Sequence, residues 1–297
     1  MAGKINGTGV ALVTPFRNHG TIDFTSLGKL IEHVIAGDVD FIVALGTTSE
    51  AATMSKDERV AAMDYIVETV DGRVPIIMGV GGNNTQGVID TIKSIAFDGI
   101  DGILSVAPYY NKPQQKGIYY HFKNIAAASP VPVIIYNVPG RTSSNISAEL
   151  TLRLANEFSN IIAVKEASGD LVQIMDIIQH KPAGFKVFSG DDALTFPMMM
   201  LGGEGVISVV ANAYPKEFSM MVRESAKGSE EKARVLHYSL LQFINAIFED
   251  GNPSGIKAAL EVMGLCSNNL RLPLVKVNKG TFNKIQSMIE KFKAPAF

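Results

Sequence analysis

The residue in this sequence with the clearest chemical potential is Lys165, which lies within the short apolar run 161–167. The run is rich in β-branched residues and has polar segments on both sides, as expected for a buried strand. A buried lysine loses the water that stabilises its ammonium, so its pKa falls. The uncharged amine attacks carbonyl carbons, and we therefore expect imine chemistry at Lys165. The alternative is an edge strand whose lysine points to solvent and protects the sheet edge.

Groups that transfer protons or bind anions follow several other apolar runs. They are Thr47 and Thr48, Tyr109 and Tyr110, Tyr136 and Arg141, and Asp191 and Asp192. A keto acid bound to a lysine as an imine loses a methyl proton to become an enamine nucleophile, and the proton transfers need a phenol and hydroxyls nearby. Hydroxyls and backbone N–H groups suit one substrate carboxylate, and an arginine suits a second one bidentately. This inventory predicts carbon–carbon bond formation through an enamine.

Each of these groups also has an ordinary structural explanation. The explanations are a capping box for Thr47-x-x-Glu50, a packed turn for Tyr109-Tyr110, a solvated loop cation for Arg141 and a helix N-cap for Asp191-Asp192. Their convergence with a desolvated lysine on one end of the fold favours the chemical interpretation.

Eight apolar runs predict buried strands, and most are separated by segments with helical spacing. The predicted strands are residues 9–14, 41–45, 75–80, 102–107, 131–138, 161–167, 186–190 and 205–210, and the helices between them are 24–36, 56–70, 85–97, 117–128, 147–157 and 170–179. Strands rich in Val and Ile, alternating with helices, indicate a parallel sheet covered on both faces. Eight such units predict a (β/α)8 TIM barrel, whose active site lies at the carboxyl ends of the strands. An open doubly wound sheet is disfavoured because no GxGxxG follows the first strand.

Strand signals stop near residue 226, and a C-terminal helical appendage is expected. The segment 230–249 carries Leu236, Leu240, Ile244 and Ile247 on one stripe, and residues 253–263 and 281–293 are also predicted helices. We therefore divide the chain into a catalytic barrel, residues 1–226, and a helical region, residues 227–297.

Composition excludes several classes of function. The 297 residues carry a net charge of −2, which gives no reason to expect nucleic acid or an acidic membrane as a partner. No signal peptide or membrane span is predicted, and the single cysteine, Cys266, fits a reducing compartment, so a cytoplasmic location is expected. The five histidines lack metal-ligand spacing, and no metal site is expected.

Four motifs together make the chain similar to the dihydrodipicolinate synthase family, within the group that includes N-acetylneuraminate lyase. They are GTTSE at 46–50, PYYNKP at 108–113, YNVPGRT at 136–142 and VKEASGD at 164–170. The resemblance spans essentially the whole chain. It implies a lyase that condenses pyruvate with L-aspartate 4-semialdehyde through a lysine Schiff base. The implied product is 4-hydroxy-tetrahydrodipicolinate, an intermediate of diaminopimelate and lysine biosynthesis.

The resemblance also implies roles for individual residues. Lys165 forms the Schiff base, Tyr136 donates and accepts protons, and Thr47 links Tyr136 to Tyr110, which reaches in from a neighbouring subunit. The substrate-binding residues are Thr48, Ile207 through its backbone, Gly190, and Arg141 for the carboxylate of the semialdehyde. A homo-oligomer, a tetramer built as a dimer of dimers, is therefore expected. No cofactor is implied, because the lysine–pyruvate imine itself acts as the electron sink.

Two other functions compete with this one. A pyruvate-dependent aldolase or lyase acting on a sugar acid would share Lys165 and Tyr136, but the resemblance to the synthases includes Arg141 and the Thr47-Thr48 pair, which sialic acid lyases are not expected to have. A catalytically silent barrel that only binds ligands should have lost Lys165 or Tyr136, and both are present.

The chain departs from the family pattern in two places. The segment NPSGIK at 252–257 lacks a second proline often seen there, with little expected effect on catalysis. Regulated members bind lysine at a dimer interface, and Asn83 and Tyr109 match that effector site. Lys56 and Gly87 stand where inhibited members have a histidine and a glutamate. A cation there repels a cationic effector, so weak or absent inhibition by L-lysine is predicted.

Overall fold

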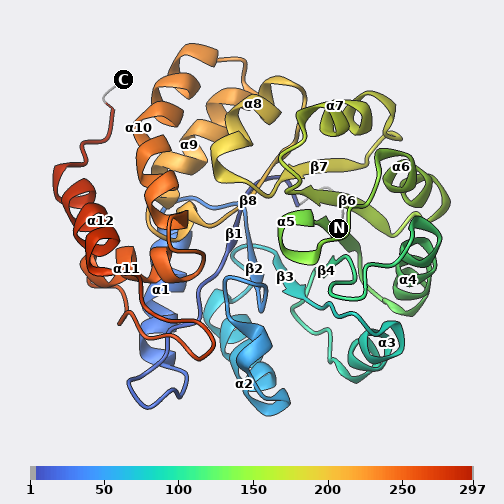
Figure 1. Cartoon of the computed structure of the whole chain (residues 1–297), viewed down its shortest axis with the longest axis horizontal. Coiled ribbons are helices and arrows are strands. Elements are labelled where there is room, and N and C mark those ends of the chain that lie inside the picture. Colours follow the sequence, from blue (N-terminus) through green and yellow to red (C-terminus); the bar gives the residue numbers. More distant parts are fainter. Residues whose placement is uncertain (1–4, 296–297) are drawn as a thin grey trace.

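The computed structural model describes residues 5–295, and it confirms the predicted (β/α)8 barrel. Eight parallel strands follow one another around a closed barrel, in which β1 pairs with both β2 and β8, and helices surround it (Figure 1). The strands are β1 (Gly7–Ala11), β2 (Phe41–Ala44), β3 (Ile76–Gly79), β4 (Gly102–Val106), β5 (Val133–Asn137), β6 (Ile161–Glu166), β7 (Lys186–Ser189) and β8 (Gly205–Ser208). A closed barrel has no sheet edge, so the edge-strand alternative for Lys165 is wrong.

Each predicted strand is present, but the observed strands are shorter than the apolar runs. All eight end one to three residues early, because the last apolar residues of each run leave the sheet and begin the loop that follows. Strand β1 also begins two residues earlier than predicted, where Gly7 and Thr8 pair with β8. Gly205 allows this closure, because a Cβ there would lie 2.0 Å from the carbonyl oxygen of Gly7.

The helices of the barrel lie between the strands. They are α1 (Phe24–Ala36), α2 (Lys56–Val70), α3 (Thr85–Ser94), α4 (Gln115–Ala128), α5 (Pro139–Thr142), α6 (Ala148–Glu157), α7 (Leu171–His180), α8 (Thr195–Met200) and α9 (Pro215–Ala226), with short 3₁₀ turns at Ala51–Thr53, Asp192–Leu194 and Val210–Asn212. Helices α1 and α2 have the predicted bounds. The predicted capping box of α2 is confirmed, since Ser55 and Glu58 exchange both hydrogen bonds. Sequence periodicity did not predict α5, α8 or α9, and α5 and α8 are too short to show it.

Two apolar layers hold the barrel together. One fills the barrel interior with side chains such as Phe41, Ile134 and Phe188, and the other lies between the strands and the surrounding helices. The interior layer also includes Tyr136 and Ile207, two of the predicted site residues. The barrel interior below the carboxyl ends of the strands is therefore filled with packed side chains and is not an open channel.

The C-terminal helices are α10 (Glu230–Phe248), α11 (Ser254–Val262) and α12 (Lys279–Lys291). They lie on one side of the barrel, beside α1 and α9 (Figure 1). The predicted stripe of α10 is buried, since Leu236, Leu240, Ile244 and Ile247 are all in the core. The domain division at 226/227 stays a prediction; α9 ends at Ala226. Within residues 5–295, no helix is long and apolar enough to span a lipid bilayer.

Candidate active site

Lys165 and Tyr136 are neighbours at the carboxyl ends of β6 and β5. The strand register pairs the two residues directly, and the Nζ atom of Lys165 lies 4.5 Å from the centre of the Tyr136 ring. Lys165 is 6% exposed, and within residues 5–295 its ammonium donates no hydrogen bond and forms no ion pair. The strand therefore places a desolvated amine beside a phenol.

Burial changes the proton affinity of both groups. It lowers the pKa of Lys165 to about 8; the charge of Asp192 partly opposes this shift, and Arg141 adds to it. Burial raises the pKa of Tyr136 to about 12, and Arg141 opposes that rise. Near neutral pH the site therefore combines a phenol that keeps its proton with a lysine of which an appreciable fraction is uncharged.

Backbone groups on β7 and β8 complete the surroundings of Lys165. Gly190 follows β7, and a Cβ at this position would lie 2.9 Å from Cε of Lys165 and 2.7 Å from the Cβ of Ala167. A side chain at position 190 would therefore overlap the side chain of Lys165. Ile207 lies on β8 with its side chain in the barrel interior.

The two threonines after β2 differ in exposure. Thr47 is exposed, whereas Thr48 is buried and its Oγ1 accepts a hydrogen bond of 2.9 Å from Nδ2 of Asn252. The capping-box explanation of Thr47-x-x-Glu50 is wrong. Glu50 is buried and forms an ion pair of 2.5 Å with Lys257, and the 3₁₀ turn that follows has no side-chain cap.

Arg141 lies in the last turn of α5, directly after β5. Its Nη2 donates a long hydrogen bond of 3.5 Å to the backbone oxygen of Asn252, and its charge acts on both Lys165 and Tyr136. Arg141 is exposed, as a solvated cation would be, and its charge nevertheless acts on both residues of the site. Asn252 contacts both Arg141 and Thr48, although little effect on catalysis was expected in this segment.

Tyr109 and Tyr110 lie in the loop after β4, and both are exposed. Tyr110 is 88% exposed, with a backbone φ of 74°, and Tyr109 is 41% exposed. Tyr110 does not fit the packed-turn explanation, because its side chain is almost fully exposed. Within one chain Tyr110 is thus not gathered with Lys165 and Tyr136.

Asp191 and Asp192 have different roles. Asp191 caps the 3₁₀ turn after β7 by accepting from the N–H of Ala193, as expected of an N-cap. Asp192 is buried, and its Oδ2 accepts from the N–H groups of Val209 and Val210, directly after β8. Burial raises the pKa of Asp192 to about 6, so it is ionised at neutral pH and acts electrostatically on Lys165. The N-cap explanation of Asp192 is therefore wrong.

A second buried polar pair lies one residue beyond Tyr136 and Lys165. Asn137 donates from Nδ2 to both carboxylate oxygens of Glu166, at 3.1 and 3.0 Å, and burial raises the pKa of Glu166. The bonds link β5 to β6 at the level of the site. Sequence reasoning missed this pair, although the motifs YNVPGRT and VKEASGD contain both residues.

The predicted effector residues lie on the surface. Asn83, Lys56 and Gly87 are exposed. The backbone oxygen of Asn83 accepts a hydrogen bond of 3.4 Å from Nδ2 of Asn111, which follows Tyr109 and Tyr110 in the loop after β4. Among residues 5–295 there is no group of three His, Cys, Asp or Glu side chains placed to hold a metal ion.

The match to known proteins covers nearly the whole chain. The model of the dihydrodipicolinate synthetase family matches residues 4–292. The chain belongs to this family. The 4-hydroxy-tetrahydrodipicolinate synthases of Flavobacterium psychrophilum and Parabacteroides distasonis are 52% and 50% identical to it, over 94% and 96% of this chain and 95% and 96% of theirs.

A solved structure of the same family has a similar fold. The dihydrodipicolinate synthase of Acinetobacter baumannii, solved in complex with pyruvate, is 38% identical, with a TM-score of 0.93 over 96% of this chain and 98% of that one. These comparisons confirm the predicted activity, that of a 4-hydroxy-tetrahydrodipicolinate synthase, a lyase of lysine biosynthesis in the dihydrodipicolinate synthetase family.

Proposed function

We propose that Lys165 carries the synthase reaction by forming a Schiff base with pyruvate. The uncharged amine attacks the keto carbon and water leaves, giving an iminium. Loss of a methyl proton then gives the enamine, whose carbon attacks the aldehyde of L-aspartate 4-semialdehyde. The amine of that substrate next displaces Lys165 and closes the ring of 4-hydroxy-tetrahydrodipicolinate. The observation that carries this proposal is a buried lysine amine over a tyrosine ring, without an ion pair among residues 5–295.

Tyr136 is the proposed proton donor and acceptor. Its position over Lys165 suits proton delivery as water leaves the keto carbon. Thr47 would pass protons between Tyr136 and Tyr110. Thr48, the backbone of Ile207 and the space beside Gly190 would hold the pyruvate, and Arg141 would bind the carboxylate of the semialdehyde bidentately.

The proposed relay requires a second copy of the chain. Tyr110 is 88% exposed in the single chain, so the phenol that completes the relay would come from the same residue of a neighbouring subunit. An isologous dimer exchanges such residues in both directions. We propose a homo-oligomer on this ground, a tetramer of two such dimers, working in the cytoplasm, where a lone buried thiol such as Cys266 stays reduced.

Borohydride trapping tests the central step. Incubation with pyruvate and sodium borohydride should add one reduced pyruvate to the peptide that contains Lys165, and mass spectrometry would locate it. Turnover is then compared for L-aspartate 4-semialdehyde, N-acetylmannosamine and simple sugar aldehydes. Trapping at another lysine would contradict the assignment, and turnover with only a sugar aldehyde would favour the sugar-acid aldolase. Sedimentation and mixing of Tyr110→Phe with Lys165→Ala chains would test the shared site.

A further inference from the structure

We propose that the C-terminal region positions Thr48 for pyruvate through a buried ion pair between Lys257 and Glu50 and through the side chain of Asn252. Lys257 and Asn252 are then positioning residues that belong to the helical appendage, while the residue they position belongs to the barrel. The inference rests on the proposed role of Thr48 in holding the carboxylate of pyruvate.

The ion pair is completely buried. The side chains of Lys257, on α11, and Glu50, in the loop after β2, are both 0% exposed, and Nζ of Lys257 lies 2.5 Å from Oε1 of Glu50. The same ammonium donates to the backbone oxygen of Asn269 at 2.8 Å and lies 4.3 Å from the centre of the Phe16 ring. These three contacts fix the position of the ammonium, and the carboxylate keeps it from acting as a free nucleophile.

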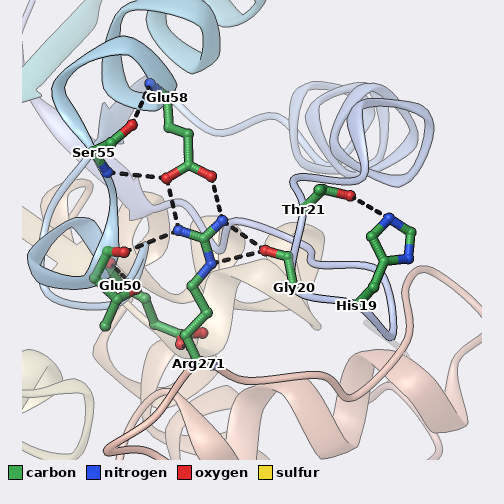
Figure 2. Close-up of polar contacts among 8 residues, drawn as sticks. His19, Gly20, Thr21, Glu50, Ser55, Glu58 and Arg271 are labelled. Carbon is green, nitrogen blue, oxygen red and sulfur yellow. Dashed lines mark hydrogen bonds and ion pairs between the residues drawn. The ribbon is translucent and has the colours of Figure 1, made fainter.

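The second oxygen of Glu50 is also held by the C-terminal region. Oε2 accepts a hydrogen bond of 3.0 Å from the backbone N–H of Arg271. The guanidinium of Arg271 in turn donates to the backbone oxygens of Gly20 and Thr53 and pairs with Glu58, as Figure 2 shows for Gly20 and Glu58. Both carboxylate oxygens of Glu50 are therefore bound by groups that follow residue 250 in the sequence.

The backbone of Glu50 needs such support. Its φ of 56° is in the left-handed region, which is unfavourable for a residue other than glycine and persists only where surrounding contacts impose it. Its N–H donates to the backbone oxygen of Thr47 at 3.1 Å, which closes the turn that contains Thr48. Holding the Glu50 carboxylate therefore holds the turn on which both threonines are carried.

Asn252 sets the direction of the Thr48 hydroxyl. Because Nδ2 of Asn252 donates to Oγ1 of Thr48 at 2.9 Å, one lone pair of that oxygen is occupied and its hydrogen is available to donate elsewhere. A hydroxyl oriented as a donor is what an anionic carboxylate requires. The main-chain oxygen of Asn252 contacts Arg141 as well, so one C-terminal residue touches the proposed binding groups of both substrates.

Stability alone does not explain the buried pair. Removing two charges from water costs free energy, and apolar side chains of similar volume commonly serve the folded state as well or better. Directional bonds to both oxygens of Glu50 do something apolar packing does not, because they define where the turn lies. The pair is therefore expected to affect substrate binding even when the fold is preserved.

The test is a double variant, Lys257→Met with Glu50→Gln, which removes both charges together and leaves no uncompensated charge in the core. Its KM for pyruvate should rise about 10-fold, roughly the loss of one charge-assisted hydrogen bond, with kcat changed less than about 3-fold. The matched control is Lys284→Met with Glu249→Gln, an exposed pair of 2.7 Å between α12 and α10, which should leave KM unchanged. A folded double variant with normal KM for pyruvate would overturn the proposal.

A second measurement decides the matter if the double variant does not fold. Asn252→Ala and Thr48→Val are compared singly and together, and their effects on the KM for pyruvate should be non-additive, since Asn252 acts through Thr48. Additive effects would refute positioning. Failure of borohydride to trap pyruvate on the unmodified enzyme would instead contradict the proposed function, which separates the two failures.

Discussion

Within residues 5–295 two lysines are buried, and their surroundings differ. Lys165 on β6 has no ion pair among the described residues, and its Nζ contacts the face of the Tyr136 ring. Lys257 on α11 has a carboxylate at 2.5 Å, a carbonyl oxygen at 2.8 Å and the Phe16 ring beneath it. Burial lowers the pKa of both.

The difference teaches what a buried lysine needs in order to react. An ammonium held by a carboxylate keeps its proton and its donor geometry, and it serves as a fixed point in the structure. An amine without such a partner is desolvated and its pKa falls, so an appreciable fraction of it is an uncharged nucleophile near neutral pH. Asp192 acts on Lys165 through its charge, and its Oδ2 accepts hydrogen bonds from two backbone N–H groups.

The largest expected effect is on the reactive lysine. Lys165→Ala should lower turnover by more than about 10³-fold, because no other group at the site can form the imine. The fold should persist, since Lys165 has no ion pair or hydrogen bond within residues 5–295 to lose. Steady-state kinetics would measure the turnover, and a thermal melt would measure the stability of the fold. An active Lys165→Ala enzyme would contradict the distinction between a reactive Lys165 and a structural Lys257.

The structural lysine should show the reverse pattern. Lys257→Met alone leaves the carboxylate of Glu50 buried without a counter-charge, which should cost about 3–5 kcal/mol of unfolding free energy. Urea denaturation would measure this loss. A cost below about 1 kcal/mol would mean that water reaches Glu50, contrary to its complete burial.

The electrostatic environment of Lys165 should appear in the pH dependence of kcat/KM for pyruvate. The amine reacts when it is uncharged, so the rate should rise with pH and level off above about 8, the pKa to which burial lowers Lys165. Asp192 raises that pKa, so Asp192→Asn should move the rise to lower pH. Asp191→Asn is the matched control and should leave the profile in place. A shift to higher pH in Asp192→Asn would contradict the role assigned to its charge.

The smallest effect is expected of an exposed lysine, which keeps its water and its charge. Lys56 lies at the predicted effector position, and L-lysine at millimolar concentration should inhibit the enzyme weakly or not at all. The variant Lys56→His with Gly87→Glu, which restores the two residue types of inhibited members, should gain inhibition by L-lysine. Micromolar inhibition of the unmodified enzyme would contradict the prediction.

Local pattern was sufficient for most of the fold. Helices α1 and α2 have the predicted bounds because, in each, the N-cap and the apolar residues lie within a few positions of each other in the sequence. Strand ends were less well predicted, because the last apolar residues of each run pack in the loops rather than in the sheet. Helix α3 ends three residues early for a similar reason, since Ile95 turns to an extended conformation and packs on the core with Phe97.

The candidate site was predicted in its residues but not in its connections. The polar groups after β2, β5 and β6 were identified from type and position. The exposure of Tyr110 and the burial of Asp192 were not, because a motif does not say which way a loop side chain points. The Asn137–Glu166 pair was missed for the same reason, since each residue looks like an ordinary strand end when taken alone.

The sequence by itself determined the barrel, the family and the burial of Lys165, because alternation, motif and apolar run are all local and each is complete within a short segment. Only the tertiary structure decided that Lys257 pairs with Glu50, 207 positions away, and that Asn252 reaches Thr48 from 204 positions away. Such contacts depend on where the C-terminal helices dock on the barrel. That docking is set by the packing of whole surfaces, which no local pattern records.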